Sequence, residues 1–273
     1  MDTGIKIIKG LLIALLLLPS LAWGGETQIA RMNPYILGAG TGAAAGPTYC
    51  SSATQAGTTT YLICEDFEGS ADCGGTGDDT YCWNTWVPTG SVVFNADGIE
   101  GTRSAETDTA AEARFFYKAV TATDSLYAFF MLKIVDTPST AAKNIFYLTA
   151  TGTYKSIQVV VSTGRALYVA HGTISSIADP TTALTEGTTY YVWFGYTKST
   201  TDAPENGTAY VCYSEDMTKP ADPTTDAACS NVTVGDLDRQ VNRVYFGSPT
   251  PSDADYVIDR IRISSTDIGS DPE

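Results

Sequence analysis

The sequence is poor in the residues that most metal and catalytic sites require. It contains a single histidine, His171, and no two cysteines with C-x-x-C spacing, which disfavours a zinc site. It has no G-x-S-x-G or P-loop motif, so the usual signs of a serine hydrolase or a phosphate-binding loop are missing. Basic residues are scarce, at 16 against 31 acidic residues. The resulting net charge of −15 repels nucleic acid and anionic lipid, so neither is expected as a partner.

The N-terminus has the order of a secretory signal peptide. Lys6 and Lys9 precede an apolar run over 11–18, and small residues follow it. The run is much shorter than the roughly 20 residues that a membrane span needs, so no span is expected after processing. We predict a signal peptide over 1–24, cleaved after Gly24 or two residues earlier, with a retained anchor as the alternative. Its loss removes two lysines and one aspartate, which takes the net charge to −16 and predicts a secreted or cell-surface protein.

The cysteine count is even, which in an exported chain predicts three disulfides. Six cysteines allow 15 connectivities. Proximity in the sequence favours three local pairs, Cys50–Cys64, Cys73–Cys82 and Cys212–Cys229.

The mature chain divides into a lead-in, one domain and a short tail. The lead-in over 25–60 is rich in Gly, Ala, Ser and Thr and has no apolar period, which indicates a flexible segment. Strand-length runs separated by turn residues fill 61–269, without a helical segment of useful length between them, and 270–273 form the tail. This pattern predicts an all-β sandwich or barrel. The clearest strands are 125–135, 144–150, 156–162, 165–172, 188–198, 208–214, 243–248 and 254–264.

Several strands carry apolar or aromatic residues on both faces. In 125–135, Leu126, Phe130 and Leu132 share one face, and Tyr127 and Phe129 lie on the other. The second face is either a binding surface or a surface covered by loops or a partner.

The strand over 254–264 poses the question of a buried carboxylate. Ile261 and Ile263 alternate with polar residues, and Asp259 falls on the same parity as these two isoleucines. Burying a carboxylate costs several kcal/mol unless a partner is present. Candidate partners are Arg243, Arg260 or Arg262 in an ion pair, or a backbone group in a turn hydrogen bond.

Three segments together resemble the concanavalin A-like lectin/glucanase superfamily, and laminin-G-like domains within it. They are "CEDFEG" (64–69) followed by "WNTW" (83–86), the hairpin-like "LTEGTTYYVWFGYTKS…NGTAYVCYSED" (184–216), and "RVYFGS…DYVIDRIRIS" (243–264). The resemblance implies a jelly-roll sandwich of two antiparallel sheets with a carbohydrate site on the concave face. It also implies a structural Ca²⁺ held by an Asp that matches Asp259, and Asp66, Glu68 and Gly69 are the expected further ligands.

Aromatic side chains are the best candidates for stacking on sugar rings. Trp193 and Tyr191 share one face of a strand and lie about 7 Å apart by strand rise. Core packing is the alternative for each aromatic. The predicted ligand-binding residues are Trp83, Trp86, Tyr127, Phe129, Tyr168, His171, Tyr191 and Trp193.

Catalytic motifs of the superfamily are missing or altered. The glucanase spacings Glu-x-Asp-x-x-Glu and Glu-x-Asp-x-Glu do not occur. A lyase could use Gln158, Arg165, Tyr168 and His171, but Tyr168 and His171 differ in strand parity. We therefore expect a non-catalytic carbohydrate-binding module, with a polysaccharide-cleaving enzyme and a structural or adhesive surface protein as the alternatives.

Overall fold

The computed structural model describes residues 61–65, 67, 84–86, 99, 104–107, 114–150, 157–171, 176–177, 180–201, 206–233, 237, 239–248 and 254–270. The predicted signal peptide over 1–24 and the lead-in over 25–60 lie outside this part of the chain, as do the last three residues of the tail. Among the residues described, no helix is long and apolar enough to cross a membrane.

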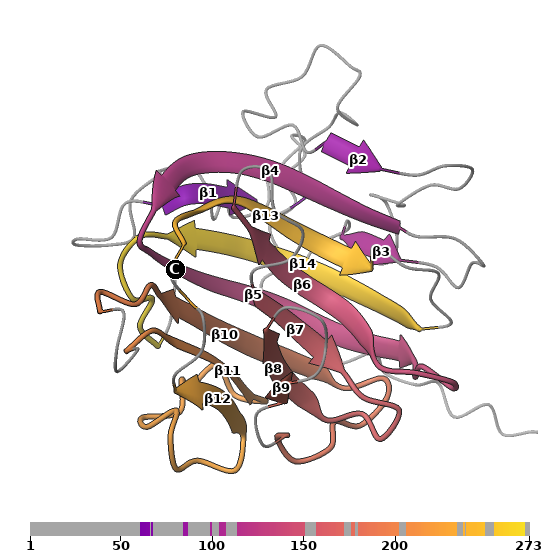
Figure 1. The fold of residues 1–273 in the computed structure, drawn as a ribbon. Helices are drawn as coiled ribbons and strands as arrows, with labels where there is room; N and C mark the ends of the chain where they lie inside the picture. Colours follow the sequence, from indigo (N-terminus) through magenta and orange to yellow (C-terminus); the bar gives the residue numbers. More distant parts are fainter. Residues whose placement is uncertain are drawn as a thin grey trace, which may run out of the picture. The chain divides into compact units, whose positions relative to one another are not determined.

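The described residues form an all-β structure (Figure 1). Its strands are β1 (Tyr61–Glu65), β2 (Asn84–Trp86), β3 (Ala105–Thr107), β4 (Arg114–Thr123), β5 (Ser125–Asp136), β6 (Lys143–Thr149), β7 (Ile157–Val161), β8 (Leu167–His171), β9 (Ser176–Ile177), β10 (Thr189–Thr197), β11 (Thr208–Ser214), β12 (Cys229–Thr233), β13 (Val241–Ser248) and β14 (Asp255–Ser264).

These strands make two sheets of seven, and every pairing is antiparallel. The first sheet has the order β1-β14-β5-β10-β11-β12, and β3 also pairs with β14. The second sheet has the order β2-β4-β13-β6-β7-β8-β9. The pairs β1-β14, β14-β5, β5-β10 and β3-β14 of the first sheet, and β4-β13 and β13-β6 of the second, join strands that are distant in sequence. The fold therefore combines non-local pairing with hairpins.

The two sheets pack face to face through phenylalanine rings. The ring centroids of Phe130 in the first sheet and Phe246 in the second are 5.3 Å apart, and those of Phe194 and Phe146 are 4.9 Å apart. Phe116 of β4 stacks on Phe246 within the second sheet, at 5.3 Å. One continuous hydrophobic cluster includes these residues and draws on both sheets. The all-β sandwich predicted from the sequence is therefore confirmed at the level of two packed antiparallel sheets.

The strands and hairpins read from the clearest patterns are also confirmed. The predicted strands 156–162 and 165–172 form a hairpin, the β7–β8 pair, closed by a hydrogen bond from Ser162 N to Ala166 O. The hairpin-like segment over 184–216 contains the β10–β11 pair. In β5, Leu126, Ala128, Phe130, Leu132 and Ile134 face the core, as the alternation indicates. Strands β2, β3, β4, β9 and β12 were not among the sequence predictions.

Strand β14 contains an irregularity that changes the direction of Asp259. Residues 256–259 pair in register with β5, and the register shifts between Asp255 and Tyr256 and again between Asp259 and Arg262. Arg260 takes a φ of 48°, in the left-handed region. Asp259 therefore pairs with Met131, on the outer side of the sheet, and the prediction that it shares a face with Ile261 is wrong. It is nonetheless fully buried.

The predicted disulfide between Cys212 and Cys229 is confirmed. It links β11 to β12 at positions that are directly paired in the sheet, with an S–S distance of 2.04 Å. Cys64 is also disulfide-bonded. The predicted pairs Cys50–Cys64 and Cys73–Cys82 involve residues that lie outside the described part of the chain.

Candidate functional site

Four of the predicted ligand residues lie on the outer face of the first sheet. Phe129 and Trp193 are each 1% exposed, and Tyr127 and Tyr191 are half-buried. They belong to or pack against a second hydrophobic cluster, which we call the tryptophan cluster: Tyr61, Cys64, Phe129, Met131, Trp193 and Ile268. The Phe129 and Trp193 rings are 5.4 Å apart, and Trp193 Nε1 donates to the Gly269 carbonyl at 3.2 Å. Trp193 therefore packs against its own chain, as the alternative reading of this residue proposed.

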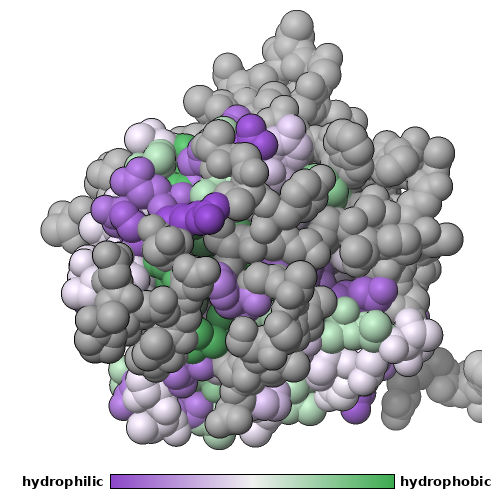
Figure 2. Space-filling model, viewed as in Figure 1, coloured by the Kyte–Doolittle hydropathy of each residue, from purple (hydrophilic) through white to green (hydrophobic). Residues whose placement is uncertain are grey.

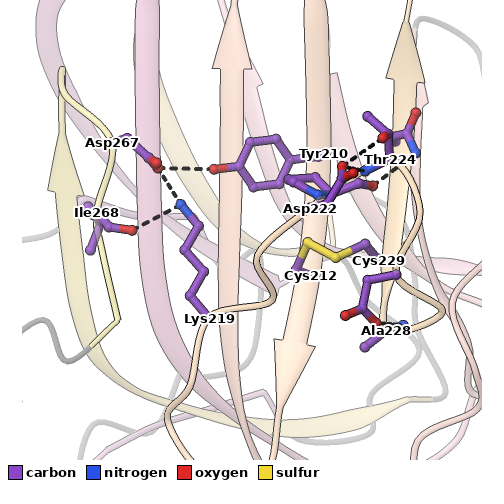
Figure 3. The surroundings of a disulfide bond; sticks show 12 residues. Tyr210, Cys212, Lys219, Asp222, Thr224, Ala228, Cys229, Asp267 and Ile268 are labelled. Carbon is purple, nitrogen blue, oxygen red and sulfur yellow. Dashed lines mark hydrogen bonds and ion pairs between the residues drawn. A yellow bond between two sulfur atoms is a disulfide. The ribbon is translucent and has the colours of Figure 1, made fainter.

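Residues 267–269 pack over the tryptophan cluster. Polar contacts hold this segment to β11 and to the loop after β11 (Figure 3). The Tyr210 hydroxyl donates to Asp267 at 3.1 Å, and Lys219 forms an ion pair with the same carboxylate. Lys219 Nζ also donates to the Ile268 carbonyl at 3.1 Å. Burial and then the charge of Asp267 raise the pKa of Tyr210, which keeps its hydroxyl protonated as a donor.

A glycine in β10 makes room for the Tyr210 ring. Gly195 is in register with Tyr210, and a Cβ at position 195 would lie 2.2 Å from one carbon of that ring. Glycine inside a strand often marks such a close approach, so "YYVWFGYT" contained a signal for this contact.

We expect Gly195→Ala to lower the free energy of unfolding by about 1–3 kcal/mol, because the Tyr210 ring must leave its place and its hydrogen bond to Asp267. Thermal or urea unfolding of the purified variant measures this. Gly164→Ala is the matched control, since a Cβ there would meet only Ser162 Oγ at 3.6 Å. Equal stability of the Gly195→Ala variant and the wild type would show that the ring moves at no cost.

The residues proposed for a lyase site lie on the second sheet and do not converge. Tyr168 contacts Val160 and Ala170 in a small cluster on the outer face. His171 shares the inward parity of Val169 and lies at the end of β8, in register with Ile157. The strand therefore places Tyr168 and His171 on opposite sides, and Arg165 sits in the preceding turn with a φ of 68°.

The predicted calcium ligands are only partly covered by the structure. Asp66, Glu68 and Gly69 lie outside the described residues. Asp259 Oδ1 accepts a hydrogen bond from Arg260 N at 2.8 Å, which is the predicted turn interaction. Its neighbours Arg260 and Arg262 are both buried, and Arg262 donates to the Glu65 carbonyl. Among the described residues no group of three His, Cys, Asp or Glu side chains lies together, and Asp66 and Glu68 are not among those residues.

Two further predicted site residues, Trp83 and Trp86, belong to the start of the domain. Trp83 lies outside the described residues. Trp86 ends strand β2, where its backbone pairs with Phe115.

A different aromatic group lies on the outer face of the second sheet. Tyr117 of β4, Tyr245 of β13 and Tyr147 of β6 occupy directly paired positions. The Tyr245 ring lies 5.1 Å from Tyr117 and 4.4 Å from Tyr147, with interplanar angles of 22° and 10°. The spacing follows from the sheet, because neighbouring strands are about 4.8 Å apart and hold the rings as parallel plates.

Two further side chains complete this surface, which we call the tyrosine face: Phe115, Tyr117, Tyr147, Arg243 and Tyr245. The Phe115 ring contacts Tyr245 at 5.7 Å and Tyr147 at 6.2 Å, both edge to face. Arg243 is exposed and lies two residues before Tyr245, so both side chains point to the same side of the sheet.

The accessible part of the tyrosine face lies over β4 and β13. Phe115, Tyr117 and Tyr245 are half-buried, whereas Tyr147 is 4% exposed. Gln158, next in register on β7, is fully buried. In the space-filling view, hydrophilic and hydrophobic surfaces of the described residues lie side by side (Figure 2). A ligand on this face would therefore lie over β4 and β13.

The sequence contained a signal for the tyrosine face. The strands β4, β6 and β13 each carry an adjacent Phe and Tyr pair, in "RFFYK", "NIFYL" and "RVYFG". Because successive side chains point to opposite faces, each Phe enters the core and each Tyr points outward. The same register places Phe116, Phe246 and Phe146 side by side inside and their tyrosine neighbours side by side outside.

Stacking decides what the tyrosine face can offer to a ligand. Both faces of the Tyr245 ring are covered by its neighbours, so this residue presents its edge and hydroxyl. A phenol hydroxyl can donate and accept, and an arginine donates through a planar fork. The face thus combines apolar ring edges with hydroxyl and guanidinium groups, which suits a ligand that has both C–H and O–H surfaces.

Comparisons with known proteins show similarity of fold. No family model matches the sequence, and no curated protein does. The chain is similar to Trypanosoma rangeli sialidase in complex with sialic acid, with a TM-score of 0.50, 15% identity, and coverage of 78% of this chain and 32% of the sialidase. It is also similar to the receptor-binding domain of botulinum neurotoxin mosaic serotype C/D, with a TM-score of 0.50, 11% identity, and coverage of 78% and 49%.

The chain spans about a third of the sialidase and about half of the toxin domain that it matches. At 15% and 11% identity these similarities establish a shared all-β fold and nothing about activity. They are consistent with the two packed antiparallel sheets of the described residues.

Proposed function

We propose that the protein is a secreted, non-catalytic carbohydrate-binding module with a concanavalin A-like jelly-roll fold, and that its tyrosine face is the binding site. The observation that carries the proposal is the stacked row Tyr117–Tyr245–Tyr147 with Arg243 beside it. Sugar rings present C–H patches and hydroxyl groups together, and tyrosine edges with a nearby guanidinium complement both.

The alternatives receive less support from the described residues. The enzyme alternative required Tyr168 and His171 to converge, and the two lie on opposite sides of β8. The adhesive alternative predicts a concave face filled by the protein's own loops. Over β6 to β8 the outer face is covered, because Tyr147, Gln158 and Tyr168 are buried. Over β4 and β13 it stays accessible, because Arg243 is exposed and its aromatic neighbours are half-buried. The sialidase neighbour was solved with sialic acid, which supports a glycan as the first ligand class to screen.

The test is a glycan array screened with the mature protein and with two matched tyrosine variants. We expect selective glycan binding that weakens at least about tenfold in Tyr245→Ala, because this ring is central to the face. Tyr127→Ala, which changes a half-buried tyrosine on the outer face of the first sheet, is expected to keep wild-type binding. Absence of binding to every glycan would overturn the proposal in favour of a structural or adhesive role.

A structural calcium ion at Asp259 remains a separate prediction from the resemblance. The measurement is the melting temperature with calcium and with a chelator, together with elemental analysis of the purified protein. A lower melting temperature after chelation and one bound calcium per chain would support the ion. An unchanged melting temperature and no bound metal would contradict the ion. Arg260 and Arg262 would then be the expected partners of the Asp259 carboxylate.

A further inference from the structure

The two sheets of this acidic protein carry opposite charge. The strands of the second sheet contain no Asp or Glu and four basic residues, Arg114, Lys118, Lys143 and Arg243. The strands of the first sheet contain five acidic residues and three basic ones. Strands are generally poor in Asp, but that tendency applies to both sheets alike. The difference therefore belongs to the second sheet itself, in a chain of net charge −15.

One of these basic residues belongs to the tyrosine face. Lys118 follows Tyr117 directly, and Lys143 pairs with Val161 of the core, so both have the inward parity of their strands. Among the described outward-facing side chains of β4, β13, β6, β7 and β8, Arg243 is the one that carries a charge.

The surroundings of Arg243 leave its guanidinium accessible. Its neighbours in register are Ala119 of β4 and Thr149 of β6, both with short side chains. Arg243 is exposed, and interaction with the nearby Tyr245 side chain raises the pKa of its guanidinium. The guanidinium therefore lies near the Tyr245 phenol and is accessible to solvent.

We propose that the tyrosine face recognises an acidic sugar, in which a single carboxylate pairs with Arg243 and the neutral part of the glycan lies over Tyr117 and Tyr245. The inference rests on the proposed carbohydrate-binding function. A guanidinium matches a carboxylate in a two-point hydrogen-bonded pair, which gives both charge and geometry.

The ligand carries one charge rather than many. Charges more than about 10 Å away are screened at physiological salt, so one carboxylate senses chiefly Arg243. A long polyanion would extend beyond the face and meet the acidic remainder of the molecule, whose net charge is −15. An isolated or terminal acidic sugar on an otherwise neutral glycan therefore fits best.

Matched glycan pairs test this inference. Binding is measured for 3′-sialyllactose against lactose and for a glucuronic acid-substituted xylo-oligosaccharide against the unsubstituted one, with polygalacturonate as the polyanion. We expect the acidic member of at least one pair to bind about tenfold more tightly than its neutral member, and polygalacturonate to bind more weakly. Arg243→Gln should remove the preference and leave binding of the neutral glycan. Arg243→Lys should retain part of it, since the charge stays and the fork is lost.

A second variant separates local recognition from overall charge. Lys133→Gln removes the same single charge from β5 of the first sheet and should leave the preference unchanged. Equal binding of acidic and neutral members in both pairs, or a preference that survives Arg243→Gln, would overturn the inference and leave the proposed function standing. Failure of the wild type to bind any glycan on the array, neutral or acidic, would instead overturn the proposed function.

Discussion

Replacing Trp193 with alanine is expected to lower the free energy of unfolding by about 3–5 kcal/mol and to leave glycan binding by the folded protein unchanged. The side chain is 1% exposed, packs against Phe129, and donates to the Gly269 carbonyl. Its loss leaves a cavity under the C-terminal segment and an acceptor without its donor. For a domain of this size the melting temperature should fall by roughly 10 °C, which calorimetry measures.

Trp193→Phe separates packing from hydrogen bonding at this position. The phenylalanine ring retains most of the contact with Phe129 but cannot donate to Gly269, so we expect a smaller loss of about 1–2 kcal/mol. A Trp193→Ala variant that keeps its stability but no longer binds glycan would contradict both the placement of the site on the tyrosine face and the role given to the tryptophan cluster.

The strands could be predicted because their alternation is simple. In β5 every second residue faces the core, and the opposite face also carries large apolar residues. The sequence alone could not show what lies over that second face. The answer depends on Ile268 and Gly269, which contact Trp193 although about 75 residues separate them along the chain. Contacts of that range leave no periodic pattern.

The candidate site was missed because one of its strands was missed. Strand β4 begins with "RFFYKAV", in which two adjacent phenylalanines blur the alternation. The tyrosine row becomes visible only when β4, β13 and β6 are known to be neighbours, since a residue of each strand must occupy the same register. Aromatic residues that were easy to notice, such as Trp193, are instead buried in packing.

The direction of Asp259 shows a further limit of parity arguments. Alternation from Ile263 and Ile261 back to Asp259 assumes an unbroken strand. The register shift at Arg260 inserts an irregularity and moves Asp259 to the outer side. A bulge of this kind depends on the local backbone, and nothing in "VIDRIRIS" marks its position by composition.

The adjacent residues Tyr245 and Phe246 are expected to give opposite results when each is changed to alanine. Phe246 is fully buried and contacts Phe116, Phe130 and Phe146, so Phe246→Ala should lower the free energy of unfolding by about 3–5 kcal/mol. The milder Phe246→Leu keeps most of the volume and is expected to cost less than Phe246→Ala. In either variant the folded fraction should bind glycan normally, because the outward face of β13 is unchanged.

Tyr245→Ala reverses this pattern. Its ring is half-buried and stands on the outer face between Tyr117 and Tyr147, so its removal costs packing energy only on one side of the sheet. We expect a smaller loss of stability than for Phe246→Ala, together with the loss of glycan binding. Unfolding curves and glycan binding, measured on the same preparations of Tyr245→Ala and Phe246→Ala, test these two expectations. If Phe246→Ala lost binding while still folded, or Tyr245→Ala kept it, the separation between an inner face that stabilises and an outer face that binds would be wrong.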